Sequence, residues 1–252
     1  MVTRRLIVCL DVKGDRVVKG VQFESLRVVG DPVAMAERYE ADGADEIVYL
    51  DISASTEERS TFLDLARQTA ERLFIPLTIG GGIRSANDVA RALRAGADKV
   101  GVNTAAVESP EILTECAIRF GSQCVVASID AKRSGQGWLV YTRGGRTPTS
   151  LDAVAWAREC VRRGAGELLV TSIDRDGART GYDLELTAAI ADAVDVPVVA
   201  SGGAGAASDV CDALMLGHAD AALVAGILHE GATTVQHIKA EMTRYGIPVR
   251  AA

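Results

Sequence analysis

The chain has 252 residues, of which 48% are hydrophobic and 24% charged, with 25 glycines and 6 prolines. This composition is typical of a globular protein with a large core, and it excludes disorder as the dominant state. The 27 basic and 34 acidic residues give a net charge of -7, so the basic surface of a nucleic-acid-binding protein is not expected.

Uncharged stretches are too short for a membrane-spanning helix or for a signal peptide, so we expect a soluble, cytoplasmic protein without a membrane partner. The five cysteines are odd in number and form no C-x-x-C pair, which predicts reduced core thiols. The three histidines lack metal-ligand spacing. We therefore expect no metal and no cofactor, and acid-base chemistry carried by carboxylates.

Eight short apolar runs alternate with eight segments of helical periodicity. In chain order, the expected strands are 6–10, 46–50, 76–79, 99–102, 124–129, 167–171, 197–200 and 221–224. The expected helices are 32–41, 58–73, 86–95, 110–120, 151–163, 184–193, 208–216 and 233–245. Eight alternations in a chain of this length predict an α/β protein, a (β/α)8 TIM barrel in a single domain over 1–252.

The second half of the sequence repeats the first. Residues 76–89 align with 197–210, and a glycine-containing turn ends the helix that follows each segment. The segment 10–13 likewise matches 129–132. Similarity at this spacing predicts two half-barrels, about 1–120 and 121–252, within the one domain.

Two aspartates hold equivalent places in this repeat. Asp11 ends the first expected strand and Asp130 the fifth, so they would face each other across the end of the barrel that carries the reactive groups. Such a pair can divide the work of general acid and general base. The alternative is that each aspartate merely caps the loop that follows it.

Glycines follow the third strand at 80–82 and the seventh at 202–203. Glycines let backbone N–H groups approach an anion, and Asn103-Thr104 and Ala225-Gly226 follow the next strand in each half. The duplication favours two phosphate sites and a substrate with a phosphate at each end, although each glycine pair alone could be a tight turn.

Two further loops could contact that substrate. After the sixth strand, Asp176-Gly177 could donate backbone N–H groups to the second phosphate or could form a common turn, and residues 51–54 occupy the equivalent place after the second strand. The long segment 13–27, which carries Lys19, is expected to be a loop that closes over the substrate.

Four charged residues, Arg5, Glu46, Lys99 and Glu167, each begin an expected strand, at the end of the barrel opposite the aspartates. If they point inward, two bases and two acids would neutralise one another in a ring. If they point outward, they are ordinary surface charges. The residues alone leave both possibilities open.

The sequence closely resembles the cyclase subunit family of imidazole glycerol phosphate synthase in histidine biosynthesis, over essentially the whole chain. The motifs are VCLDVK at 8–13, VVKG at 17–20, YLDISA at 49–54, GGGI at 80–83, VNTA at 102–105, GSQ at 121–123, IDAKR at 129–133, TSIDRDG at 171–177 and ASGGAG at 200–205. The isomerase of the preceding step shares the repeat and the aspartate pair, but it lacks TSIDRDG. That isomerase and a noncatalytic scaffold are the alternatives.

The resemblance implies that ammonia attacks a bisphosphate ribotide, that AICAR leaves and that the imidazole ring of imidazole glycerol phosphate closes. It implies the catalytic pair Asp11 and Asp130, with Lys19 on a mobile loop. One phosphate would be bound by Gly82, Asn103 and Thr104, and the other by Asp176, Gly177, Gly203, Ala225 and Gly226. Arg5, Glu46, Lys99 and Glu167 match the gate through which ammonia enters from a glutaminase subunit, the partner in a heterodimer.

Some positions depart from the family pattern. Gly14 and Asp15 stand in the reverse of the common order, Gly226 stands where serine is frequent, and the segment 206–217 is one residue longer. Neither predicted catalytic aspartate is affected by these differences.

Overall fold

The computed structural model describes residues 2–21, 24–52 and 56–250. Residues 22–23 of the expected loop 13–27 and residues 53–54 of the segment 51–54 lie outside the described residues. The strands are β1 (Arg5–Lys13), β2 (Arg16–Val21), β3 (Glu24–Gly30), β4 (Glu46–Asp51), β5 (Leu77–Gly80), β6 (Lys99–Val102), β7 (Val125–Ser134), β8 (Gly137–Thr142), β9 (Thr147–Asp152), β10 (Glu167–Ser172), β11 (Val198–Ser201) and β12 (Ala221–Val224).

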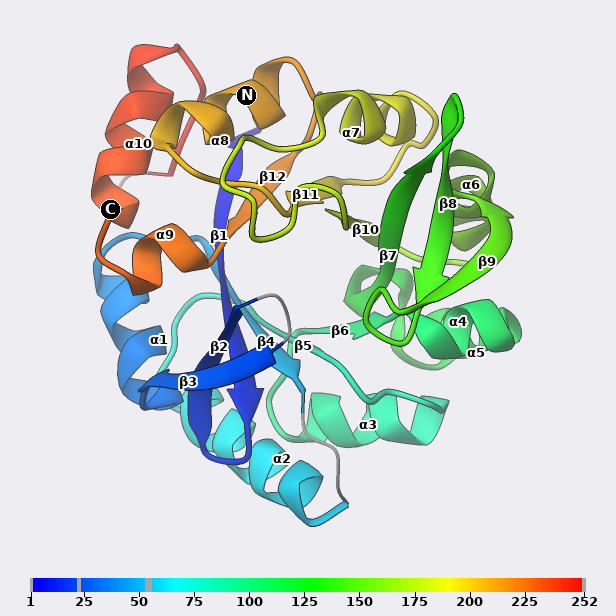
Figure 1. Ribbon diagram of the computed structural model, residues 1–252. Coiled ribbons are helices and arrows are strands. Elements are labelled where there is room, and N and C mark those ends of the chain that lie inside the picture. Colours follow the sequence, from blue (N-terminus) through cyan, green and yellow to red (C-terminus); the bar gives the residue numbers. More distant parts are fainter. Residues whose placement is uncertain (1, 22–23, 53–55, 251–252) are drawn as a thin grey trace.

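Eight of these strands close into a parallel barrel. The ring runs β1-β4-β5-β6-β7-β10-β11-β12, and β12 pairs with β1 to close it. Figure 1 shows the ring of helices around these strands. The predicted (β/α)8 architecture is confirmed, and β1 and β7 lie four places apart, on opposite sides of the ring.

The helices are α1 (Pro32–Ala41), α2 (Thr56–Ala70), α3 (Ala86–Arg94), α4 (Thr104–Glu108), α5 (Glu111–Phe120), α6 (Ala153–Arg162), α7 (Leu184–Ala191), α8 (Ala207–Met215), α9 (Gly226–His229) and α10 (Val235–Arg244), with a 3-10 turn at Ser122–Cys124. Side-chain caps begin equivalent helices in the two halves. Asp31 accepts from the N–H of Ala34 at the start of α1, and Asp152 accepts from Ala155 at the start of α6, both at 2.9 Å. The half-barrel boundary near residue 120 stays a prediction.

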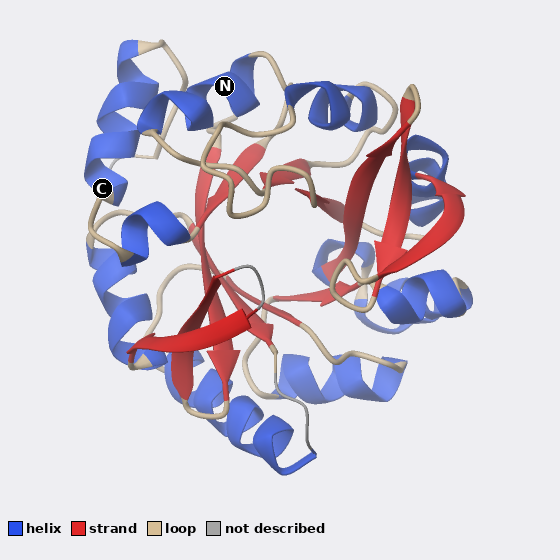
Figure 2. Ribbon diagram, viewed as in Figure 1, coloured by secondary structure: helices blue, strands red, loops and turns tan. Residues whose placement is uncertain are grey.

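The prediction of a loop over residues 13–27 is wrong, because most of the described residues in this segment form β2 and β3. Its closure over the substrate stays a prediction. β1 and β7 each continue beyond the barrel into antiparallel strands, β2–β3 and β8–β9, which Figure 2 shows in red outside the ring. Gly14 and Gly135 have φ of +61° and +59° at the turns after β1 and β7. The β8–β9 pair was not predicted, and because β9 extends to Asp152, the helix expected from 151 begins at Ala153.

The buried apolar residues form two clusters. The larger lies between the barrel and the helices, and the smaller contains Ile7, Cys9, Val48, Val126, Leu169, Val199, Ala221 and Leu223 from the barrel strands. All five cysteines are buried and free, as expected. Within the described ranges, no helix is long and apolar enough to cross a membrane.

Candidate active site

The two predicted catalytic aspartates point into the barrel because of strand alternation. On β1, Leu6, Val8 and Leu10 belong to the outer cluster, whereas Ile7 and Cys9 belong to the inner one. Asp11 therefore continues the inward-facing set. The same argument applies to β7, where Val126 faces inward and Asp130 lies four residues further along.

Both aspartates hold their protons unusually tightly. Burial and, as a second cause, the nearby negative charge of Asp176 together raise the pKa of Asp11 to about 6. Burial also raises the pKa of Asp130 to about 6, although Nδ2 of Asn103 donates to Oδ2 of Asp130 at 2.8 Å and stabilises its ionised form. One carboxyl can therefore be protonated while the other is ionised near pH 6.

A third carboxylate lies at the same mouth, which we define as the carboxyl ends of the barrel strands. Loss of hydration raises the pKa of Asp176, and a hydrogen bond from the N–H of Gly177 partly opposes that shift. The carboxylate acts electrostatically on Asp11 and on Asp130, so it lies within electrostatic range of both. Asp176 was predicted as a phosphate contact, and its place in the structure also makes it a neighbour of the carboxyl pair.

Gly82, Asn103 and Thr104 follow the adjacent strands β5 and β6, and we call this group the first cradle. Gly81 and Gly82 have φ of +88° and +61°, which favours glycine. At Gly81, a Cβ would lie 2.1 Å from the carbonyl oxygen of Asp51. The glycines thus let this loop turn tightly against the neighbouring strand.

The residues predicted for the second phosphate follow the adjacent strands β10, β11 and β12: Asp176, Gly177, Gly203, Ala225 and Gly226. Lys19 of β2 joins them, because its Nζ would lie 3.1 Å from a Cβ at Gly226, and we call this whole group the second cradle. Gly203 has φ of +111°, and a Cβ there would lie 2.3 Å from the carbonyl oxygen of Gly181. The N–H of Gly181 donates to the carbonyl of Gly203 at 3.0 Å. The structure brings all the predicted residues of each cradle to one side of the mouth, and the two cradles face each other across the ring.

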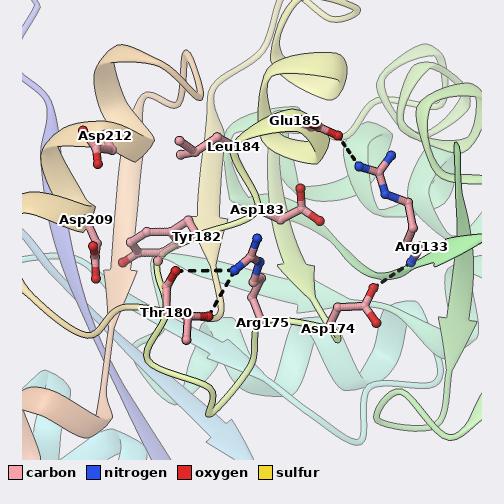
Figure 3. A pocket seen from close by; sticks show the side chains of 11 residues that line it. Arg133, Asp174, Arg175, Thr180, Tyr182, Asp183, Leu184, Glu185, Asp209 and Asp212 are labelled. Atoms are coloured by element: carbon pink, nitrogen blue, oxygen red, sulfur yellow. Dashed lines mark hydrogen bonds and ion pairs between the residues drawn. The ribbon is translucent and has the colours of Figure 1, made fainter. Parts of the chain in front are cut away.

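Hydrogen bonds and ion pairs hold the loop that carries Asp176 and Gly177 (Figure 3). Arg175 donates to the hydroxyl of Thr180 at 3.1 Å, and the N–H of Arg133 donates to Asp174 at 2.7 Å. Arg133 also pairs with Glu185 at the start of α7. These residues line a hollow of about 510 Å³ that contains none of the predicted site residues.

The four charges at the lower end of the barrel, the amino ends of its strands, form one ring, which we call the charged ring. Arg5 lies 2.9 Å from Glu46 and 3.3 Å from Glu167, and Lys99 lies 2.7 and 3.0 Å from the same two carboxylates. Glu46 is 2% exposed and also accepts from the hydroxyl of Thr78 at 2.5 Å. Side chains from four separate strands can meet only on the barrel axis, so the outward-facing alternative is wrong.

The charges in the ring compensate one another. Burial by itself lowers the pKa of Arg5, but Glu167 and Glu46 reverse this effect and raise it. Above the ring lies the inner apolar cluster, which includes Val48, Val126 and Val199. The barrel therefore has a charged lower end, an apolar middle and an acidic mouth.

Strand alternation also reveals residues that the sequence analysis missed. Ser128, Thr171 and Ser201 lie two residues beyond Val126, Leu169 and Val199, so their hydroxyl groups face inward. Thr171 and Ser201 are in register with Asp130 at the mouth, and Ser128 lies one step below. Counting in twos along each strand could have found them.

A buried histidine was also missed. His229 Nδ1 lies 2.7 Å from the hydroxyl of Tyr39, and Nε2 lies 2.9 Å from the carbonyl oxygen of Cys9. Burial lowers the pKa of His229 to about 4, so a neutral ring ties α9 to β1. Nothing in the sequence around His229 indicated these partners. Elsewhere in the described part of the chain, no group of three or more His, Cys, Asp or Glu residues is placed to hold a metal ion.

A closed parallel barrel with two buried carboxyl groups of raised pKa at its mouth is typical of the (β/α)8 class of enzymes. The model of the histidine biosynthesis protein family matches residues 5–234. The imidazole glycerol phosphate synthase subunit HisF of Myxococcus xanthus is 70% identical over 251 residues, covering 100% of this chain and 99% of that protein. The proteins of the same name from Halalkalibacterium halodurans and Anoxybacillus flavithermus are each 56% identical over 252 residues, covering 99% of this chain and 100% of each relative.

The chain belongs to the histidine biosynthesis family and, within it, to the cyclase subunits of imidazole glycerol phosphate synthase. It is therefore an enzyme of histidine biosynthesis.

Proposed function

We propose that the chain uses Asp11 and Asp130 as an acid-base pair to convert the phosphoribulosyl formimino aminoimidazole carboxamide ribotide and ammonia into imidazole glycerol phosphate and AICAR. The observation that carries this proposal is two facing carboxyl groups whose pKa values are both raised to about 6. The protonated member donates to a leaving or carbonyl atom while the ionised member accepts a proton from the attacking nitrogen.

The substrate spans the mouth, with one phosphate in the first cradle and the other in the second. Backbone N–H groups at positive-φ glycines bind phosphate without requiring a basic surface, which suits a protein of net charge -7. In the first cradle, Oδ1 of Asn103 is buried and has no hydrogen-bond partner within the described part of the chain. This oxygen can accept a hydrogen bond from the bound substrate.

Ammonia enters through the charged ring and passes along the barrel axis to the mouth. The apolar residues between ring and mouth favour neutral ammonia over ammonium, because burying an unpaired charge is costly. Arg5, Glu46, Lys99 and Glu167 form the gate. Because the four are fully paired, at least one ion pair must break for a molecule to pass.

A glutaminase subunit docks over the lower end of the barrel and forms a heterodimer. Phe74 and Ile118, near the carboxyl ends of α2 and α5, are 95% and 80% exposed at that end. A hollow of about 280 Å³ lies beside Phe74 and is lined by Leu73, Pro76 and Asp98, among others. Exposed apolar side chains next to a hollow are common at protein interfaces. Phe74→Ala should therefore weaken the complex without changing turnover with ammonium salt.

The decisive experiment supplies the purified chain with the bisphosphate ribotide and ammonium salt. Release of AICAR and imidazole glycerol phosphate is expected, and Asp11→Asn or Asp130→Asn should abolish it. Isomerisation of the substrate of the preceding step would support the sugar isomerase instead. A correctly folded preparation without either activity would support a scaffold and refute the proposal.

A further inference from the structure

The second cradle contains an ion cluster that the proposed chemistry does not use. Glu230, directly after α9, forms ion pairs with Lys19 of β2 and with Arg179 in the loop after β10. Three segments distant in the sequence therefore meet on one carboxylate. The side chains of Lys19, Glu230 and Arg179 are 28%, 41% and 44% exposed, so each can exchange its partner for a ligand.

The cluster lies directly over Gly226. A Cβ at Gly226 would lie only 3.1 Å from Nζ of Lys19, a tight contact that would push the ammonium group away by a few tenths of an ångström. The Lys19 cation therefore lies close to the backbone of the second cradle, where Gly226 leaves room for it.

The backbone that carries Arg179 is fixed by close packing on the neighbouring loop. Arg179 has φ of +57°, and a Cβ at Gly205 would lie 2.3 Å from its carbonyl oxygen. Two residues further along, the N–H of Gly181 donates to Gly203 at 3.0 Å. The loop after β10 therefore lies on the loop after β11 and holds Arg179 beside the cradle.

We propose that Arg179 is an anion-binding residue that acts alongside Lys19 in the second cradle, and that Glu230 is their competing counter-ion. While the cradle is empty, Glu230 neutralises both cations. An entering phosphate group takes over Lys19 and Arg179, and the Glu230 carboxylate turns toward solvent. The proposal rests on the proposed function for the assignment of a phosphate to this cradle.

Glu230 competes at every ordinary pH. The hydrogen bonds from Arg179 and Lys19 lower the pKa of Glu230 to about 2, so the carboxylate is ionised throughout the range in which the enzyme can be assayed. Mild acid therefore does not remove the competition of Glu230 for Lys19 and Arg179, and a substitution of Glu230 is needed. Glu230→Gln keeps the shape of the side chain and removes its charge.

The proposal is tested by titrating the protein with inorganic phosphate and monitoring its backbone amide resonances by NMR, which report binding separately at each cradle. In Glu230→Gln, the Kd reported by the Gly226 amide should fall about threefold to tenfold, the size expected from two partly exposed ion pairs. The amides of Gly82 and Thr104, in the first cradle, should report an unchanged Kd.

Arg179→Asn should raise the Kd at Gly226 about threefold or more, and asparagine tolerates the left-handed backbone that residue 179 adopts. The matched control is Glu115→Gln, which removes one negative charge from a partly exposed ion pair with Arg119 on α5. It should leave the Kd at Gly226 unchanged, because its charge lies outside the cradle.

An unchanged or higher Kd at Gly226 in Glu230→Gln would overturn the proposal, as would the absence of a phosphate response at Gly226 in both proteins. These outcomes are independent of turnover. The cyclase reaction is tested by product release from the unmodified chain, so either proposal can fail while the other stands.

Discussion

The two ends of the barrel contain the same kind of group under opposite conditions. At the lower end, Glu46 and Glu167 are buried but contact Arg5 and Lys99. At the mouth, Asp11 and Asp130 are buried and form no ion pair with a cation among the described residues, and their pKa values rise. Buried carboxylates that contact cations form a compact ion cluster, whereas buried carboxyl groups with raised pKa values can exchange protons near pH 6. The difference lies in their neighbours.

The largest expected effect comes from breaking the pair at the mouth. Asp11→Asn and Asp130→Asn should each lower kcat with ammonium salt at least about a thousandfold, and the double variant should be little worse than either single one, because the two groups act as a unit. Steady-state assays of AICAR release measure this. If the two effects multiply in the double variant, the carboxyl groups act independently and the acid-base pairing is wrong.

Breaking the charged ring comes next. Lys99→Met leaves Glu46 and Glu167 with Arg5 alone, and the loss of a partner from a buried ion cluster should lower the free energy of unfolding by about 3 kcal/mol. Glutamine-dependent turnover in the heterodimer should change more than ammonia-dependent turnover of the chain. Urea denaturation and the two assays measure these effects, and equal changes in both activities would contradict a role in ammonia passage.

A smaller effect concerns the free-energy cost of burying the ionised carboxyl group of Asp11 at the mouth. Because the pKa of Asp11 is about 6 in the folded protein and about 3.8 ordinarily, the folded state loses stability as pH rises from 4 to 6 and carries the full penalty above 6. Asp11→Asn removes that penalty. It should raise the free energy of unfolding by about 1–2 kcal/mol at pH 7.5, after allowance for solvent screening. Near pH 4 the gain should shrink, and equal gains at both pH values would contradict the burial argument.

The smallest expected effect is that of an exposed ion pair, with which the buried charges at both ends of the barrel can be compared. Glu115 and Arg119 form an ion pair at 2.7 Å on the outer face of α5, where both side chains are well exposed. Glu115→Gln should change the free energy of unfolding by less than about 0.5 kcal/mol. A loss as large as that of Lys99→Met would show that burial does not explain the strength of the charged ring.

Much of this arrangement could be predicted from the sequence. The parallel strands, the opposed aspartates and the two glycine cradles follow from local patterns and from the internal repeat. The alternation of side chains along a strand could also have predicted the charged ring, because Arg5 precedes Asp11 by six residues and Glu167 precedes Thr171 by four. Even spacing places each pair on one face of its strand, which already favours an inward ring over surface charges.

The hairpins were harder to predict. The strand β9 is exposed or half-buried along its whole length, so it lacks the buried apolar face that predicts a strand. The sequence around both hairpins reads as a loop when the following helix is taken as the next element. Their pairing depends on β1 and β7 extending past the rim, which is a property of the closed barrel.

The sequence by itself determined the barrel, its repeat and the residue types at each end of the strands, because these depend on periodicity and order along the chain. Only the tertiary structure decided which charges are paired and which are not. Lys19, Arg179 and Glu230 are separated by 160 and 51 positions, yet they meet over Gly226 because loops from different strands converge on one rim. Electrostatic neighbours, unlike strands, are set by distance in space, so the raised pKa values at the mouth, the closed ring below and the shared counter-ion appear only in the folded barrel.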